Sequence, residues 1–346
     1  MKEIQAAVLT KLNEPLEIKK LNSRKLLAGQ VLVKIAYSGI CRSQLMEIQG
    51  HRGHDKWLPH LLGHEGSGEV IDVGRGVKKV KKGDEVVLSW IKSSGLESEE
   101  IKYDEVENDQ VINSGKITTF SNYSVISENR IIKKPKVLNL KEAVLFGCAL
   151  PTGAGMVLNE STMNKDSKVL VIGLGGVGLS AIAALLSLDI NKIVAVDITK
   201  KKLDLVSSWG VENTINLKDN NFSKKFKNIY PEGADFCFES AGQVSTIETA
   251  FSLINSSGKV VFASHPPDDQ KISIYPHELI SGKKLEGTWG GSVNPDKDIP
   301  KMTKKICGNF NLNNFLSEPY KLNQINRAVR DLSLGKVLRP IIRMEH

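Results

Sequence analysis

The chain has 346 residues, of which 40% are hydrophobic, and a formal net charge of +8. This length suits two domains or one large one, with enough apolar side chains for a sizeable core. Its Lys and Arg residues are spread along the whole chain and form no block interleaved with aromatics, which excludes a nucleic-acid groove. The N-terminal stretch lacks an apolar signal core, and no run of 18 apolar residues occurs, so we expect a soluble, cytoplasmic protein without a membrane segment.

The cysteine usage fits a reducing compartment. Cys41, Cys148, Cys237 and Cys307 are scattered and form no CxxC pair, which argues against a disulfide framework. Each cysteine is therefore expected to be a small buried hydrophobe, a metal ligand or a nucleophile. The diffuse positive charge favours anionic ligands such as a phosphorylated cofactor.

Residues 1–150 are predicted to be mostly β-structure. Short Val- and Ile-rich runs bounded by glycines predict strands over 29–41, 66–74 and 83–90, and few stretches show a helical period. The polar, acidic segment 92–110 is predicted to be a surface loop or hairpin.

Residues 151–288 alternate between strand and helix patterns. Strands are predicted over 168–173, 192–197, 234–242 and 258–264, and helices over 176–189 and 200–210. This alternation predicts an α/β fold with a parallel sheet covered by helices on both faces. Beyond residue 289 we expect helices over 298–310 and 322–335 and a last strand over 338–344.

A dinucleotide fingerprint opens the second region. In VLVIGLGGVGLS, Gly173, Gly175 and Gly178 have G-x-G-x-x-G spacing after an apolar strand and at the start of a helix, and Asp197 ends the next strand. Such glycines let the pyrophosphate approach the helix N-terminus, and the acidic residue binds the adenosine ribose and repels a 2′-phosphate. NAD is therefore preferred to NADP. Three lysines at 200–202 would weaken that preference unless they form a solvated helix face, and a glycine-rich turn without a cofactor is the alternative interpretation.

Three further motifs carry a family resemblance. GICRS near residue 40, GHEGSG near 65 and LFGCALPTGAG near 150 precede or join the fingerprint. The chain resembles the zinc-dependent, medium-chain alcohol dehydrogenase family over almost its whole length. The resemblance implies a GroES-like catalytic domain over 1–150, a Rossmann coenzyme domain over 151–288 and a return of the chain to the catalytic domain over 289–346.

The resemblance also implies a catalytic zinc held by Cys41, His64 and Cys148. Two thiolates and a neutral imidazole suit Zn²⁺, and three protein ligands leave one position open for water or a substrate oxygen. Taken singly, a cysteine in an apolar run is more often core, and a histidine in a loop is more often surface. Glu65 follows a ligand directly, where it either tunes the metal or has a structural role beside it.

Other positions match family residues one by one. Ser43 matches the hydroxyl that starts the proton relay, and Trp90 falls where an aromatic side chain lines the substrate pocket, although a plain core aromatic is an equal alternative. The positions that match cofactor-binding residues, including the turn glycines, are Arg42, Thr152, Gly173, Gly175, Gly176, Val177, Gly178, Asp197, Lys202 and Arg339.

The chain departs from the family pattern in three places. It has no cysteine between Cys41 and Cys148, so we expect one zinc per chain and no structural zinc. Met46 occupies the position of a relay histidine. The long, basic segment 50–60 offers His51 as the nearest substitute, because an imidazole exchanges protons near neutral pH. The alternative is a solvated loop, with water completing the relay.

These observations predict a zinc-dependent oxidoreductase that transfers a hydride between NAD and a primary or secondary alcohol, a polyol or a sugar-type substrate. Alternatives are an enzyme that acts on S-(hydroxymethyl)glutathione, a zinc-free quinone reductase-like member of the superfamily, and a binding protein without catalysis. We expect a homodimer or homotetramer.

Overall fold

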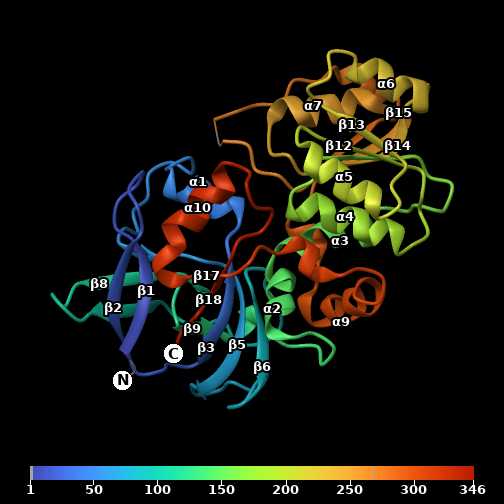
Figure 1. The fold of residues 1–346 in the computed structure, drawn as a ribbon. Helices are drawn as coiled ribbons and strands as arrows, with labels where there is room; N and C mark the ends of the chain where they lie inside the picture. The colour runs from blue at the N-terminus through green and yellow to red at the C-terminus, as the bar shows by residue number, and fades with distance from the viewer. Residues whose placement is uncertain (1–2, 268) are drawn as a thin grey trace. The chain divides into compact units, whose positions relative to one another are not determined.

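The computed structural model describes residues 3–267 and 269–346 (Figure 1). The chain divides into two compact units. The first comprises the chain through Cys148 together with 294–303 and 311–346, and the second comprises 149–293 and 304–310. The C-terminal return to the first unit thus starts at residue 294, not at 289, and is interrupted by seven residues of the second unit. Within the described ranges, no helix has the length and apolarity needed to cross a membrane.

The first unit contains a closed barrel and a seven-stranded sheet. The barrel strands, in spatial order, are β1 (Glu3–Leu9), β2 (Glu17–Ser23), β7 (Ile101–Glu105), β8 (Val111–Ser114) and β4 (His60–Leu61). The sheet runs β10 (Ile131–Lys133), β6 (Glu85–Ser89), β5 (Glu65–Val73), β3 (Gln30–Gly39), β18 (Ile341–Arg343) and β17 (Tyr320–Lys321), with β9 (Tyr123–Ser127) also paired with β3. In Figure 1 the red C-terminal strand β18 lies beside the blue β3, and Ile341 pairs with Gly39.

The strands predicted over 29–41, 66–74 and 83–90 correspond to β3, β5 and β6. The polar segment from residue 92 is irregular up to residue 100 and then forms the β7–β8 hairpin. Helix α1 (Arg42–Ile48) was not predicted, because seven residues are too short to show a helical period. The remaining helices that belong wholly or partly to this unit are α2 (Leu140–Ala143), α9 (Pro295–Ile306) and α10 (Ile325–Ser333).

A buried carboxylate anchors the irregular segment before this hairpin. Glu128, which is 2% exposed, accepts backbone N–H bonds from Lys78 at 2.6 Å and from Lys79 and Leu96 at 2.7 Å. Asp296 accepts from Ser94 N–H at 2.9 Å and binds Lys79 Nζ at 2.6 Å. Polar side chains therefore hold this segment, in which the sequence has no cysteine.

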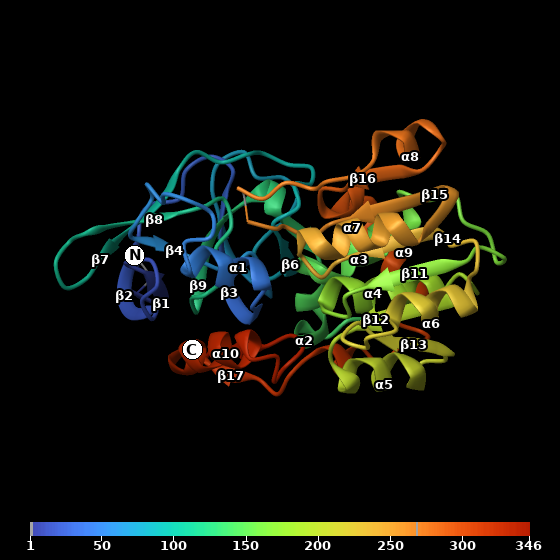
Figure 2. The ribbon, with the colours of Figure 1, turned by 90° about the horizontal axis from the view of Figure 1, so that it is seen from above.

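The second unit is a parallel sheet whose strand order reverses in its middle. The order is β13 (Asn213–Asn216), β12 (Ile193–Asp197), β11 (Val169–Ile172), β14 (Ala234–Glu239), β15 (Ile254–Phe262) and β16 (Lys284–Gly287). Helices cover both faces of the sheet (Figure 2); they are α3 (Ala149–Leu158), α4 (Gly176–Leu186), α5 (Lys200–Ser208), α6 (Phe222–Ile229) and α7 (Val244–Leu253). The short α8 (Pro276–Ile280) buries none of its residues. Every residue of β11 and β12 is buried, as expected when helices cover both faces. In this Rossmann arrangement, ligands bind at the carboxyl ends of the strands where the order reverses.

Candidate active site

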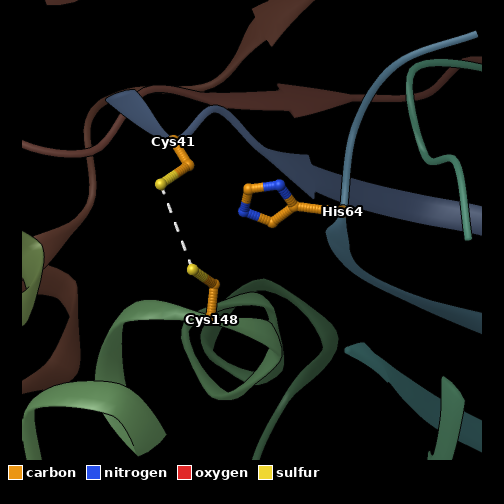
Figure 3. A group of neighbouring side chains, drawn as sticks. All are labelled: Cys41, His64 and Cys148. Atoms are coloured by element: carbon orange, nitrogen blue, oxygen red, sulfur yellow. Dashed lines mark hydrogen bonds between the residues drawn. The ribbon is translucent and has the colours of Figure 1, made fainter. Parts of the chain in front are cut away.

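Cys41, His64 and Cys148 belong to the first unit, and each lies at a junction between secondary-structure elements. Cys41 is the N-cap residue of α1, just after β3. His64 separates β4 from β5, and Cys148 lies between a 3₁₀ turn over Val144–Gly147 and α3. Figure 3 shows the imidazole and the two thiols pointing toward a common point.

The geometry of these three side chains fits a zinc ion. The two sulfur atoms are 4.0 Å apart, and one ligand atom from each residue lies within 4.8 Å of the others. Tetrahedral Zn–S bonds of about 2.3 Å would place two sulfurs about 3.8 Å apart. His64 Nε2 is buried and has no hydrogen-bond partner in the described part of the chain, although such an atom normally has one. A cation bound at this point would satisfy it.

The charges around the thiols favour ionisation of one of them. The hydrogen bond from Cys148 lowers the pKa of the Cys41 thiol well below its ordinary value, and the positive charge of Arg339 acts in the same direction against burial. The same sulfur–sulfur bond, together with burial, raises the pKa of Cys148. Cys41 is therefore the thiol that ionises more readily, and a bound cation would favour the thiolate form of both, since thiolates are the form that binds metals.

A buried ion pair lies beside the cysteines. Arg339 Nη2 donates to Glu65 Oε2 at 2.5 Å; Arg339 is 5% exposed and Glu65 is completely buried. Burial raises the pKa of Glu65, and the charge of Arg339 opposes that shift. A Cβ atom on Gly39 would approach Glu65 Oε1 to 2.5 Å, so only glycine leaves room for the carboxylate there. We expected Arg339 to bind the cofactor, but its guanidinium group pairs with the Glu65 carboxylate.

Two residues that the sequence did not single out hold the backbone around His64. Gln44 Oε1 accepts the Gly63 N–H at 2.6 Å, and Thr119 Oγ1 donates to the Glu65 carbonyl at 3.0 Å. Gly63 has φ +91°, a left-handed conformation that favours glycine. The only local signal for Gln44 in the sequence is its position three residues after the predicted ligand Cys41. Nothing in the sequence places Thr119 near His64.

The remaining predicted residues of the first unit differ in their placement. Ser43 Oγ is buried and has no hydrogen-bond partner among the described residues. The Trp90 ring stands edge-on to the His64 ring, with centroids 6.4 Å apart. Arg42 and His51 are exposed, and no hydrogen bond within the described ranges joins the His51 ring to Ser43. The structure therefore places a buried Ser43 hydroxyl two residues after the predicted ligand Cys41, and it places the Trp90 ring against the predicted ligand His64. His51 has neither kind of contact.

The second unit holds the fingerprint residues around the N-terminus of α4. Gly173 has φ +87°, and a Cβ on Gly178 would collide with the Gly173 carbonyl, as the close packing of helix on strand requires. Gly175 is the N-cap of α4 and has open space where its Cβ would be, which leaves the backbone accessible to a ligand. Gly176 and Val177 begin α4 and are partly buried.

The Asp197 carboxylate lies at the carboxyl end of β12. It accepts N–H bonds from Leu174 at 2.7 Å and Thr199 at 2.9 Å, and it pairs with Lys202 Nζ at 3.2 Å. The carboxylate therefore also fixes the turn that carries the glycines. Lys202, one of the three clustered lysines, balances its charge. Thr152 is buried within α3.

Comparisons with known proteins agree with this architecture. Residues 27–136 match the alcohol dehydrogenase GroES-like domain, and residues 176–307 match the zinc-binding dehydrogenase family. An S-(hydroxymethyl)glutathione dehydrogenase of Escherichia coli (strain SMS-3-5 / SECEC) is 28% identical over 368 aligned positions, which cover 98% of this chain and 99% of that protein.

Solved structures are similar over the whole chain. An alcohol dehydrogenase zinc-binding domain protein from Burkholderia ambifaria has a TM-score of 0.90 and 26% identity. The benzyl alcohol dehydrogenase of Acinetobacter calcoaceticus has a TM-score of 0.89 and 26% identity, and both alignments cover 100% of each chain. With its GroES-like and zinc-binding dehydrogenase domains, this chain belongs to the zinc-dependent medium-chain alcohol dehydrogenase family.

Proposed function

We propose that this protein is a zinc- and NAD-dependent alcohol dehydrogenase. The observation that carries the proposal is the convergence of Cys41, His64 and Cys148 on one point, with the unpartnered His64 Nε2 directed toward it. When bound, zinc supplies a Lewis acid for the substrate oxygen and NAD supplies the hydride acceptor. The dehydrogenase family to which the chain belongs uses zinc and NAD(P).

Ser43 is the residue proposed to take the alcohol proton. Its hydroxyl is buried two residues after Cys41 and has no partner among the described residues, so it is available to a substrate hydroxyl. A serine must pass this proton on, because its alkoxide is too basic to persist near neutral pH. Met46 cannot accept it, and His51 is exposed. We propose that the cofactor ribose and then solvent, with or without His51, complete the relay.

Asp197 and the cysteine inventory support the proposed cofactors. The buried Asp197 carboxylate would bind the ribose hydroxyls and repel a 2′-phosphate, which favours NAD over NADP. Cys237 and Cys307 belong to the second unit, and burial raises the pKa of the Cys237 thiol well above its ordinary value. We therefore propose one thiolate-bound zinc per chain and no structural zinc of the four-cysteine type.

The proposed substrate is a small alcohol, polyol or sugar alcohol, or the corresponding carbonyl compound. The name of the E. coli relative makes S-(hydroxymethyl)glutathione the second candidate. The test follows reduced-cofactor absorbance with NAD and NADP over benzylic and aliphatic alcohols, polyols, sugars and the glutathione adduct, using Cys148→Ser as the control. Turnover with Cys148→Ser at the wild-type rate would favour a zinc-free reductase, and cofactor binding without turnover would favour a binding protein.

We also propose that the protein is a homo-oligomer, a dimer or a tetramer. β16 is the edge strand of its sheet and pairs with β15 on one side. The adjoining segment exposes Tyr275 by 78% and Ile280 by 83%, and a second copy that paired with this edge would cover them. Light scattering after size exclusion tests this, and a monomer at micromolar concentration would overturn it.

A further inference from the structure

A second group of potential metal ligands lies in the first unit, apart from the cysteines. Glu47 in α1, Asp55 in the following loop and His60 in β4 each place one ligand atom within 4.8 Å of the other two. His60 is buried, and the two carboxylates are partly buried with side-chain exposures of 23% for Glu47 and 14% for Asp55. These three residues form the carboxylate–histidine cluster.

Both ring nitrogens of His60 face an oxygen that can only accept a hydrogen bond. His60 Nδ1 lies 2.9 Å from the Leu61 carbonyl oxygen, and Nε2 lies 2.9 Å from Asp55 Oδ2. Both neighbours are acceptors, but a neutral imidazole has a single N–H. If Nδ1–H donates to the carbonyl, as is usual for a metal-binding histidine, the Nε2 lone pair faces the carboxylate. In that tautomer a metal cation between Nε2 and Asp55 would satisfy both groups, whereas in the other tautomer Nε2–H donates to Asp55 directly.

The carboxylates beside His60 offer oxygen ligands for a divalent cation. Glu47 adds a second carboxylate, whose Oε2 contacts Gln44 Nε2 at 3.2 Å and Arg52 Nη1 at 3.5 Å. Arg52 is the charged partner of Glu47 and is half exposed, so solvent screens its charge. A protonated His60 pairs with Asp55 and leaves Glu47 to the half-exposed Arg52, whereas a divalent ion would contact His60 and both carboxylates.

We propose that the carboxylate–histidine cluster is a second metal site, which binds Zn²⁺ or Mn²⁺ through Glu47, Asp55 and His60. One imidazole and two carboxylates suit either ion. Bonds of about 2.1 Å in a tetrahedral site place ligand atoms about 3.4 Å apart, a value between the 2.9 Å of His60–Asp55 and the 4.8 Å limit of the cluster.

The site would fix the loop that joins α1 to β4. This loop begins shortly after Cys41 and ends shortly before His64, so it connects two ligands of the cysteine site. Oxygen ligands and partial exposure make the cluster a weaker zinc site than one with two thiolates. Protein purified without added metal should therefore carry about one zinc, and added metal should fill the second site.

The experiment titrates metal-free full-length protein with Co²⁺ and, in parallel, with Zn²⁺, and measures bound metal by elemental analysis after removal of free ion. Co²⁺ at the cysteine site gives an intense sulfur-to-cobalt absorption band, whereas an oxygen and nitrogen site does not. The wild type is expected to bind two ions, with the band complete after one. Asp55→Asn and Glu47→Gln should each bind one ion and keep the band; Cys148→Ser should bind one ion with the band weakened or lost.

Asp55→Asn is a suitable probe because its Oδ1 can still accept the Trp57 N–H, as Asp55 does at 2.9 Å. The matched control is Asp72→Asn, since exposed Asp72 likewise accepts the next backbone N–H, that of Val73, through Oδ1. This control should bind two ions. Saturation of the wild type at one ion, or two ions in both cluster variants, would overturn the proposal and leave a protonated His60 paired with Asp55. If Asp55→Asn loses the band through misfolding, Glu47→Gln decides the result.

Discussion

Replacing Glu128 with Gln should loosen residues 92–98, the segment that the Glu128 carboxylate anchors. The carboxylate accepts three backbone N–H bonds, two at Oε1 and one at Oε2. The amide keeps one acceptor oxygen, so the Leu96 N–H would face an NH₂ group and lose its bond. Hydrogen bonds to a charged group contribute about 1.5–3 kcal/mol each, against about 1 kcal/mol for neutral ones. One lost bond and two weakened bonds together give a destabilisation of about 3 kcal/mol.

The effect should depend on pH in a defined direction. Burial raises the pKa of Glu128, but the N–H bonds from Leu96, Lys79 and Lys78 overcome this, and the pKa lies below its ordinary value of 4.5. A lowered carboxyl pKa in the folded state stabilises the fold fully above the ordinary pKa, and this contribution is lost as the pH falls through the folded-state pKa. The difference between wild type and Glu128→Gln should therefore shrink below about pH 4.5.

Hydrogen exchange followed by mass spectrometry measures this change locally, because a protein of two units need not unfold in one step. Amides of residues 92–98 should exchange about 100-fold faster in Glu128→Gln at neutral pH, since every 1.4 kcal/mol corresponds to a factor of ten. Glu99→Gln, an exposed change next to this segment, is the control and should alter exchange little. Equal exchange in the two variants would refute the assigned role of Glu128.

Four further outcomes are expected from the proposed active site. Cys148→Ser should abolish alcohol oxidation but keep NAD binding measured by calorimetry, because the fingerprint belongs to the other unit; near-normal turnover would contradict the zinc assignment. Asp197→Ala should narrow the NAD over NADP preference, and the ratio is the quantity to measure because the variant also loses the Leu174 and Thr199 N–H bonds. Ser43→Ala should lower kcat at every pH by about 10²-fold or more, whereas His51→Gln should lower it mainly below pH 8, with partial recovery in small amine buffers. An unchanged pH profile in His51→Gln would mean that the relay ends in solvent.

The sequence alone determined those parts of the fold whose signals are local. A continuous apolar run followed by spaced glycines predicted β11, the turn and α4, because a strand buried on both faces and a phosphate-binding turn each need those residue types in order. The Val- and Ile-rich runs between glycines predicted β3, β5 and β6, because β-branched residues favour strands and glycines favour the turns between them. The residue types of Cys41, His64 and Cys148, with the family resemblance, were enough to identify them as candidate ligands.

Which distant residues meet depends on how the whole unit packs. Glu65 and Arg339 are 274 positions apart, and their contact follows from the pairing of β18 with β3 and of β3 with β5. The carboxylate–histidine cluster likewise depends on how the loop after α1 returns to β4, which no residue pattern reveals. Strand order and loop paths arise from the packing of the whole unit, so contacts between residues far apart in sequence cannot be obtained from local patterns.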